Sequence, residues 1–194
     1  MAHDLSGQTI AFLVADEGVE QIELTEPWKA VEEAGGKPAL VSPDGGTVQA
    51  FNHLDRADTF EADAGLDDAE ASSYDGLVLP GGVANPDRLR ADPLAVEFVK
   101  AFFAVERPVA VICHGPWTLV EAGVLRGRTI TSWPSLQTDI RNAGGTWVDE
   151  TVHTDGMLTS SRKPDDLPRF CEAMVEQLAA HGARTASAGT RSDG

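Results

Sequence analysis

Cys113 and His114 are adjacent in the chain, at the point where an apolar run ends in a turn. The run, residues 108–113, has the length and composition of a strand that is buried on both faces. A glycine and a proline follow, and a proline suits the first turn of the helix that we predict over residues 116–123. A thiol on such a bend is displayed at the edge of a sheet, near the positive end of a helix. The pattern therefore predicts a cysteine nucleophile with a histidine beside it.

Most free cysteines are small buried hydrophobic side chains, and this is the alternative for Cys113. Cys171, the other cysteine, fits that alternative better, because it shares a helical face with five apolar side chains from Leu167 to Leu178. We expect Cys171 to serve packing alone. The histidines are scattered and no CxxC pair occurs, so we predict neither a metal site nor a cofactor.

In two further segments, groups that could take part in chemistry follow directly after an apolar run. Acidic residues in the segment 16–24 follow a strand predicted over 9–15, and neighbouring strands would bring one of them near Cys113. An acidic helix N-terminus, favoured by the helix dipole, is the alternative. The glycine pair that ends the strand predicted over 74–82 can aim N–H groups at an anion. A plain turn is the alternative there.

Alternating strand and helix patterns must position these segments. The strand at 9–15 is followed by a helical pattern over 20–36 and a second strand over 37–43. Pro27 lies inside the helical pattern and predicts a kink, or a helix that starts near Thr25. The β-α-β order predicts an α/β fold with a parallel sheet. We further expect a hairpin over 44–64, a helix over 91–106 capped by Asp92, a helix over 135–145, a hairpin over 151–161 and a helix over 164–182.

The length of 194 residues, without an internal repeat or linker, predicts one domain over 1–182. Residues 183–194 are small, polar and unpatterned, so we expect a disordered tail there. A formal net charge of −16 disfavours nucleic acid and anionic membranes as partners. No apolar run approaches the length of a membrane span, and the first residues lack a secretory pattern. We expect a cytoplasmic protein.

Four blocks of the sequence, 16–24, 76–82, 110–133 and 160–170, resemble the PfpI family of the ThiJ/PfpI superfamily. The resemblance runs from about Thr9 to Leu178, nearly the whole chain. It implies a flavodoxin-like three-layer α/β sandwich with a mostly parallel central sheet, related to the class I glutamine amidotransferase-like domain. It also implies a nucleophile elbow at the turn between the strand 108–113 and the helix 116–123, and a homodimer or larger assembly.

The resemblance assigns roles to particular residues. Cys113 matches the nucleophilic, easily oxidised cysteine, and His114 matches the histidine that follows it. Gly81 and Gly82, completed by the backbone amide of His114, match the oxyanion site. In the peptidase-like members an acidic residue of a neighbouring subunit orients the histidine. Asp87 is the candidate for that residue, although it is an aspartate where some members have glutamate, and the loop before it is one residue longer.

The resemblance also places a glutamate beside the thiol. Aligned backwards from Leu24, the E-x-x-E-L pattern selects Glu20, rather than Glu17 or Glu23, for this position. A protonated Glu20 would donate to the sulfur of Cys113. With that proton in place, we expect an apparent thiol pKa below about 7, against about 8.5 for an unperturbed thiol.

The family resemblance implies a stress-response, cysteine-dependent hydrolase of the peptidase or glyoxalase/deglycase type. Its substrate would be a peptide, a small carbonyl compound or a glycated protein side chain. The alternative is a redox sensor or holdase chaperone without turnover, whose Cys113 is oxidised to sulfenic or sulfinic acid. A glutamine amidotransferase is disfavoured, because no H-x-E pair follows the cysteine.

Overall fold

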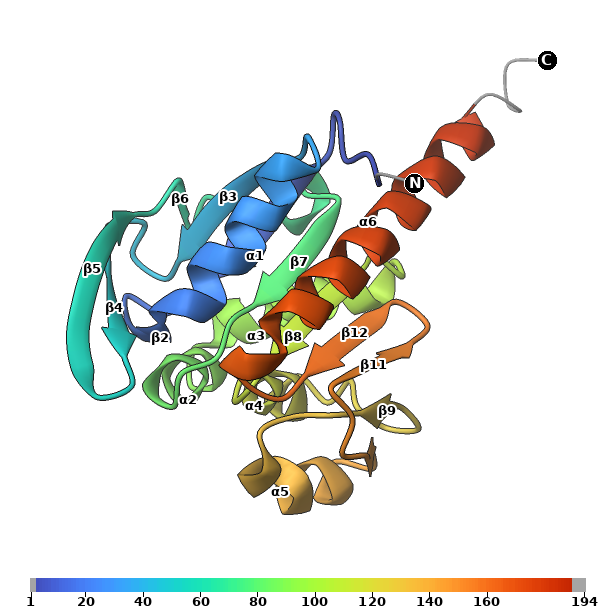
Figure 1. Cartoon of the computed structure of the whole chain (residues 1–194). Helices are drawn as coiled ribbons and strands as arrows, with labels where there is room; N and C mark the ends of the chain where they lie inside the picture. Colours follow the sequence, from blue (N-terminus) through green and yellow to red (C-terminus); the bar gives the residue numbers. More distant parts are fainter. Residues whose placement is uncertain (1–2, 190–194) are drawn as a thin grey trace.

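The computed structural model describes residues 3–189 and is built around a seven-stranded sheet (Figure 1). The strands lie in the order β11-β12-β8-β7-β1-β3-β6. Every neighbouring pair is parallel except β11 and β12, so the predicted α/β fold with a mostly parallel sheet is confirmed. The strands are β1 (Thr9–Leu13), β3 (Lys37–Ser42), β6 (Ala64–Gly65), β7 (Gly76–Leu79), β8 (Val109–Ile112), β11 (Val152–Asp155) and β12 (Leu158–Ser161).

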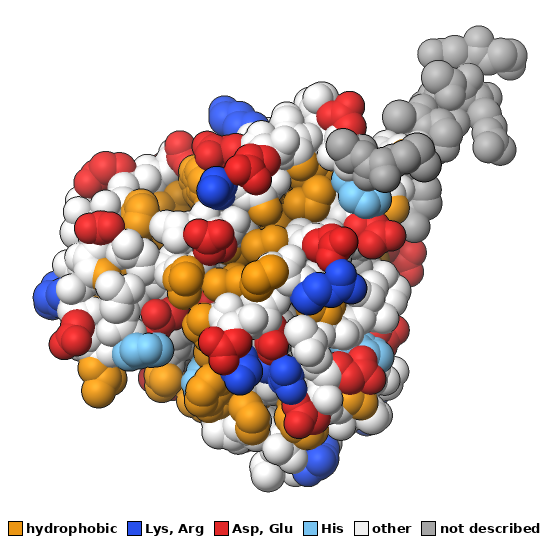
Figure 2. Space-filling view, in the orientation of Figure 1, with side chains coloured by type: hydrophobic (Ala, Val, Ile, Leu, Met, Phe, Trp, Pro, Cys, Tyr) orange, Lys and Arg blue, Asp and Glu red, His pale blue; other side chains and the backbone are white. Residues whose placement is uncertain are grey.

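Helices cover both faces of this sheet and complete the three-layer sandwich. Helices α1 and α6 lie side by side over one face, and α3 lies over the other (Figure 1). Acidic side chains are scattered over the face that α1 and α6 form (Figure 2), as the net charge of −16 leads one to expect. The helices are α1 (Gln21–Glu33), α2 (Ala84–Arg90), α3 (Pro93–Ala104), α4 (Pro116–Glu121), α5 (Gln137–Asn142) and α6 (Leu167–Gly189). Short 3₁₀ turns span Ala71–Ser73, Pro134–Leu136 and Pro164–Asp166.

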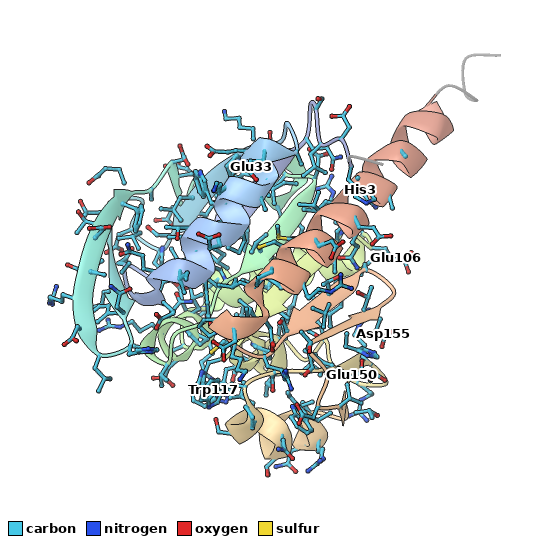
Figure 3. The ribbon with its side chains drawn as sticks, viewed as in Figure 1. His3, Glu33, Glu106, Trp117, Glu150 and Asp155 are labelled. Carbon is cyan, nitrogen blue, oxygen red and sulfur yellow. The ribbon has the colours of Figure 1, made fainter. Side chains whose placement is uncertain are left out.

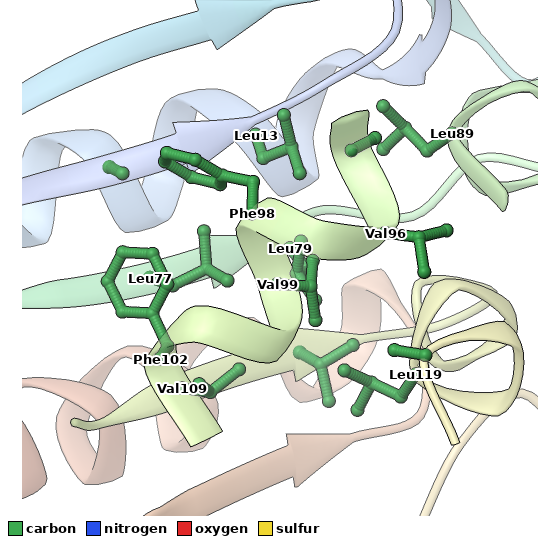
Figure 4. Packing of buried hydrophobic residues seen from close by; sticks show 14 of the residues in the cluster. Leu13, Leu77, Leu79, Leu89, Val96, Phe98, Val99, Phe102, Val109 and Leu119 are labelled. Atoms are coloured by element: carbon green, nitrogen blue, oxygen red, sulfur yellow. The ribbon is translucent and has the colours of Figure 1, made fainter. Parts of the chain in front are cut away.

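The core lies on the two faces of the sheet, because successive side chains of a strand point to opposite sides. In β8, Val109 and Val111 pack towards α3, whereas Ala110 and Ile112 pack towards α1 and α6. Figure 4 shows the α3 side of this packing. Both faces of the central strands are buried, which explains why they read as continuous apolar runs in the sequence.

Two smaller sheets stand at the edges of the sandwich. One contains β2 (Glu17–Glu20), β4 (Thr47–Asn52) and β5 (Asp55–Glu61), and the other pairs β9 (Thr129–Ile130) with β10 (Thr146–Trp147). The hairpins expected within 44–64 and 151–161 are both confirmed. The short strand β2 was not expected, and it fixes where the next helix starts.

Helix boundaries differ from the predictions in two places. Helix α1 begins at Gln21 and contains Pro27, so the helix does not start near Thr25. Helix α6 continues to Gly189, so the prediction of disorder is wrong for residues 183–189. Three of those seven residues are alanines, the strongest helix formers, and this propensity outweighs the lack of an apolar pattern. The rest of the expected tail, 190–194, lies outside the described residues.

The helix expected over 91–106 is confirmed, together with its cap. The side chain of Asp92 accepts a 2.8 Å hydrogen bond from the backbone N–H of Leu94, at the start of α3.

In the part of the chain that the structure describes, none of the helices is both long and apolar enough to span a bilayer.

Candidate active site

Cys113 stands on the predicted bend between β8 and α4, in a strained backbone conformation. Its φ angle is 61°, in the left-handed region that non-glycine residues rarely adopt. Its backbone N–H is held by the carbonyl oxygen of Ser161 at 3.1 Å. A Cβ atom on Gly115 would lie 2.8 Å from the carbonyl oxygen of Leu79, so only glycine lets the chain turn this closely. The bend thus displays the thiol at the carboxyl end of the central strands.

Glu23, and not Glu20, lies beside the thiol, which corrects the prediction from the sequence. The Glu23 side chain is fully buried and hydrogen-bonds to the side chain of Cys113. Its Oε2 atom accepts a 2.9 Å hydrogen bond from the backbone N–H of Gly81. The cause is the early start of α1: because the helix begins at Gln21, its first turn directs the third residue back towards the sheet edge.

Glu20 holds a different part of the site. Its Oε2 atom accepts a 3.0 Å hydrogen bond from the backbone N–H of His53, and the His53 Nδ1 atom lies 3.7 Å away. His53 belongs to the two-residue turn between β4 and β5. Glu20 therefore anchors the tip of this hairpin at the edge of the cavity that contains Cys113.

Burial sets the protonation of the Glu23 carboxyl. It raises the pKa of Glu23 to about 8, so the group is largely protonated at neutral pH. Since Oε2 accepts from Gly81, the proton resides on Oε1. Oε1 is buried and has no hydrogen-bond partner of its own among residues 3–189. The carboxylic acid can therefore donate to the sulfur.

The thiol itself is harder to ionise than we expected. Burial raises the pKa of Cys113 above its ordinary range, and an ionised Glu23 raises it further, both by its charge and by accepting the hydrogen bond of the thiol. Hydrogen bonds from the backbone N–H groups of His114 and Gly82 act in the opposite direction without outweighing burial. The expectation of a thiol pKa below about 7 is wrong for this reason, and activation of the sulfur requires a base.

His114 is positioned to be that base. Its Nδ1 atom lies 3.2 Å from the Sγ atom of Cys113. The imidazole stacks on the ring of Trp133 at an interplanar angle of 25°, and the ring of Trp117 contacts it from another side. Figure 3 shows where Trp117 lies in the molecule. Burial lowers the pKa of His114, so the ring is neutral at neutral pH and one of its nitrogens can accept a proton.

Two of the three predicted oxyanion donors face the sulfur. The backbone N–H groups of Gly82 and His114 both hydrogen-bond to Cys113. The Gly82 amide reaches this orientation at a φ of 84°, which glycine adopts without strain. The N–H of Gly81 instead donates to Glu23, so the prediction for Gly81 is corrected.

Asn85 is a buried residue of the site that sequence analysis missed. Its Oδ1 atom accepts a 2.7 Å hydrogen bond from the N–H of Ala15, two residues after the first strand. Its Nδ2 atom donates to the carbonyl oxygens of Pro80 and Gly81, at 3.0 and 3.1 Å. Asn85 thereby ties the glycine loop to the neighbouring strand. Nothing in the pattern around it distinguished this asparagine from a surface residue.

Asp87 is exposed on α2 and does not reach the histidine within one chain. In residues 3–189 no carboxylate hydrogen-bonds to His114. Asp87 lines a hollow of about 490 Å³ next to the cavity of Cys113.

Cys171 lies on α6, half-buried at the edge of the core. Burial and the charge of Glu26 raise its pKa to about 12.

Comparisons with known proteins agree with this geometry. A model of the family described as "DJ-1/PfpI family" matches residues 8–177. Deglycase PH1704 of Pyrococcus horikoshii is 39% identical over 169 residues, which cover 87% of this chain and 98% of that protein. General stress protein 18 of Bacillus subtilis is 43% identical over 155 residues, which cover 78% and 87%. The crystal structure of Drosophila melanogaster DJ-1beta superposes with a TM-score of 0.79 at 27% identity, covering 89% of this chain and 90% of that one.

Proposed function

Because the chain belongs to the DJ-1/PfpI family, we propose that it is a cysteine-dependent hydrolase of the deglycase type. Its substrates are small carbonyl compounds and the glycated amines that they form. One observation carries the proposal: a neutral imidazole, a protonated carboxyl and two backbone N–H groups converge on the sulfur of Cys113. A cysteine that only packs has no use for this convergence.

The first chemical step follows from these positions. The Nδ1 atom of His114 accepts the thiol proton while Sγ forms a bond to the carbonyl carbon of the substrate. The π electrons of the carbonyl move to its oxygen, which becomes an alkoxide. The N–H groups of Gly82 and His114 stabilise that oxygen. The protonated Glu23 stabilises negative charge on the sulfur before the bond is complete.

The size of the cavity favours a small carbonyl compound over a polypeptide. The cavity at Cys113 measures about 200 Å³, below the roughly 300–1,000 Å³ of sites for drug-sized ligands. Among its described residues, a single chain supplies no carboxylate that orients His114. We propose that Asp87 of a neighbouring subunit fills this role in a homo-oligomer.

The alternative role, a redox sensor or holdase without turnover, has less support. Sensor cysteines are exposed and have a low pKa, because the thiolate is the form that peroxide oxidises. Cys113 is 7% exposed, and burial raises its pKa.

The proposal is tested by product formation with matched cysteine variants. Purified protein is incubated with methylglyoxal, and separately with the adduct of methylglyoxal and N-acetyl-lysine, and release of the hydroxy acid is measured. Cys113→Ala should reduce release to the buffer rate, whereas Cys171→Ala should retain it. Equal rates for wild type and Cys113→Ala, or no product from wild type with either substrate, would refute the proposal.

A further inference from the structure

The mouth of the Cys113 cavity is lined by apolar side chains that are exposed in the single chain. Leu54 is 93% exposed, Val83 58% and Trp133 38%. Six large hydrophobic side chains are exposed in the described part of the chain, and these three all line this one cavity. We refer to Leu54, Val83 and Trp133 as the apolar rim. Exposed apolar groups gathered around a hollow mark a place where another apolar group is bound.

The position of Leu54 in the rim is fixed by its neighbours. Leu54 is the second residue of the two-residue turn between β4 and β5, and His53 is the first. His53 has a φ of 58°, where a hairpin turn of this length prefers glycine. Glu20 accepts the hydrogen bond of the His53 N–H at 3.0 Å and so holds the strained turn in place. A strained non-glycine turn that a buried carboxyl holds is a feature of functional loops.

The rim continues into the larger hollow beside the cavity. His53, Leu54 and Val83 line both spaces, and the larger one adds the rings of Phe51 and Trp117. A group bonded to the substrate carbonyl therefore has a continuous apolar path away from the sulfur. The charges near this path are mixed. Glu17 is paired with Arg56 and Arg88, and Glu20 and Asp87 are carboxylates that disfavour an anion.

We propose that the apolar rim binds the substituent of the carbonyl substrate and selects an uncharged aromatic group over a small or anionic one. Glu20 is a positioning residue in this scheme, because it holds Leu54 in place through the turn. The preference in turnover rests on the proposed function. The preference in access to the sulfur does not, since any electrophile that reaches Cys113 passes the same rim.

Alkylation of Cys113 measures the preference of the apolar rim without requiring turnover of a substrate. The protein is treated at pH 8.5 with iodoacetamide, N-benzyl-iodoacetamide or iodoacetate, and modification of the Cys113 peptide is followed by mass spectrometry. Each rate is divided by the rate of the same reagent with glutathione, which removes differences in intrinsic reactivity. We expect the benzyl reagent to be favoured over iodoacetamide by about fivefold, as contact with a few tens of Å² of apolar surface predicts, and iodoacetate to be disfavoured.

Four variants connect the preference to the rim. Leu54→Ala should bring the benzyl preference close to one. Glu20→Ala should do the same, because the turn loses its anchor, whereas Glu20→Gln should keep the preference, because an amide oxygen still accepts from the His53 N–H. Leu94→Ala is the matched control, since Leu94 is exposed on α3 and does not line the cavity. It should leave all three rates unchanged.

Turnover provides the second readout. The ratio of kcat/KM for phenylglyoxal to that for methylglyoxal should exceed one, and Leu54→Ala and Glu20→Ala should lower it about fivefold by raising KM for phenylglyoxal. A wild type without benzyl preference, or a preference that Leu54→Ala leaves intact, would overturn the proposal. So would equal acceleration of all three reagents in Leu54→Ala together with dissociation of an oligomer, since the neighbouring subunit that brings Asp87 to His114 would then cover Leu54 and leave no place for a substituent. If the benzyl reagent is preferred in alkylation but neither phenylglyoxal nor methylglyoxal is turned over, the proposed role of the apolar rim is supported and the proposed hydrolase function is refuted.

Discussion

The Nδ1 atom of His114 lies 3.2 Å from the Sγ atom of Cys113, the residue before it in the chain. Cys113 has a left-handed φ, and the imidazole of His114 stacks on the ring of Trp133. His114 lies two residues before α4 and shares the loop of the nucleophile, so it needs no rearrangement to take the thiol proton. The pH behaviour of the site therefore reflects three neighbouring groups: the thiol, the imidazole and the Glu23 carboxyl.

The pH profile of kcat/KM should be bell-shaped. On the acid side activity should fall only below the ordinary titration range of histidine, because His114 must be neutral and burial lowers its pKa. On the alkaline side activity should fall near pH 8, where Glu23 ionises. Glu23→Gln should remove the alkaline limb, and His114→Ala should reduce kcat/KM at least about 100-fold. An unchanged alkaline limb in Glu23→Gln would show that another group controls it.

Stability should decrease between pH 4.5 and pH 8 because of Glu23. The pKa of this group rises from 4.5 to about 8 on folding, so within that window the native state binds more protons than the unfolded state. Its contribution to stability is fully present below pH 4.5 and is lost as the pH rises through about 8. Urea unfolding across this range should give a slope of roughly −1 kcal/mol per pH unit, which Glu23→Gln removes and Glu33→Gln, at an exposed position, does not.

Asn85→Ala should lower the free energy of unfolding by about 3 kcal/mol. The substitution leaves the N–H of Ala15 and the carbonyl oxygens of Pro80 and Gly81 without their partner in a buried place. Urea unfolding measures the loss. Asn142→Ala, at an exposed position in α5, is the control and should change stability by less than about 0.5 kcal/mol. A loss as small as that of the control would mean that the glycine loop does not depend on Asn85.

Mixing inactive variants should restore activity if Asp87 acts between subunits. Cys113→Ala and Asp87→Asn are expected to be inactive alone. After the two are mixed, dissociated and reassembled, a heterodimer contains one site with both native residues, so about one quarter of the sites should be active in a random dimer. Activity is compared with that of each unmixed variant. Recovery of no activity, or a monomer by light scattering at micromolar concentration, would contradict a role for Asp87 in trans.

Much of the secondary structure around the site was predictable, because the sequence patterns that indicate it are local. The apolar run before Cys113 and the glycine and proline after it predicted the bend, and the Asp-Gly pair predicted the hairpin at β11 and β12. Each of these features depends on a few consecutive residues. The order of strands in the sheet then brings the ends of β1, β7 and β8 together, as parallel α/β folds do.

Glu23 could not be distinguished from Glu20 in the sequence, because the two stand three residues apart and a helical turn makes either one plausible. The choice depends on where α1 begins, and that follows from the pairing of β2 with β4, a contact far away in sequence. The apolar rim escaped prediction for a similar reason. Leu54, Val83 and Trp133 come from three separate segments, and no periodicity relates them.

The hydrogen bond from the Cys113 N–H to the carbonyl oxygen of Ser161 has a consequence for biosynthesis. In the sheet, β8 is flanked on one side by β12, which follows it in the chain. A polypeptide leaving the ribosome exposes Cys113 well before Ser161 emerges, and until then β8 is an unpaired sheet edge. The elbow therefore reaches its final geometry only after Ser161 has left the ribosome. Until then the nascent thiol lacks the geometry that activates it.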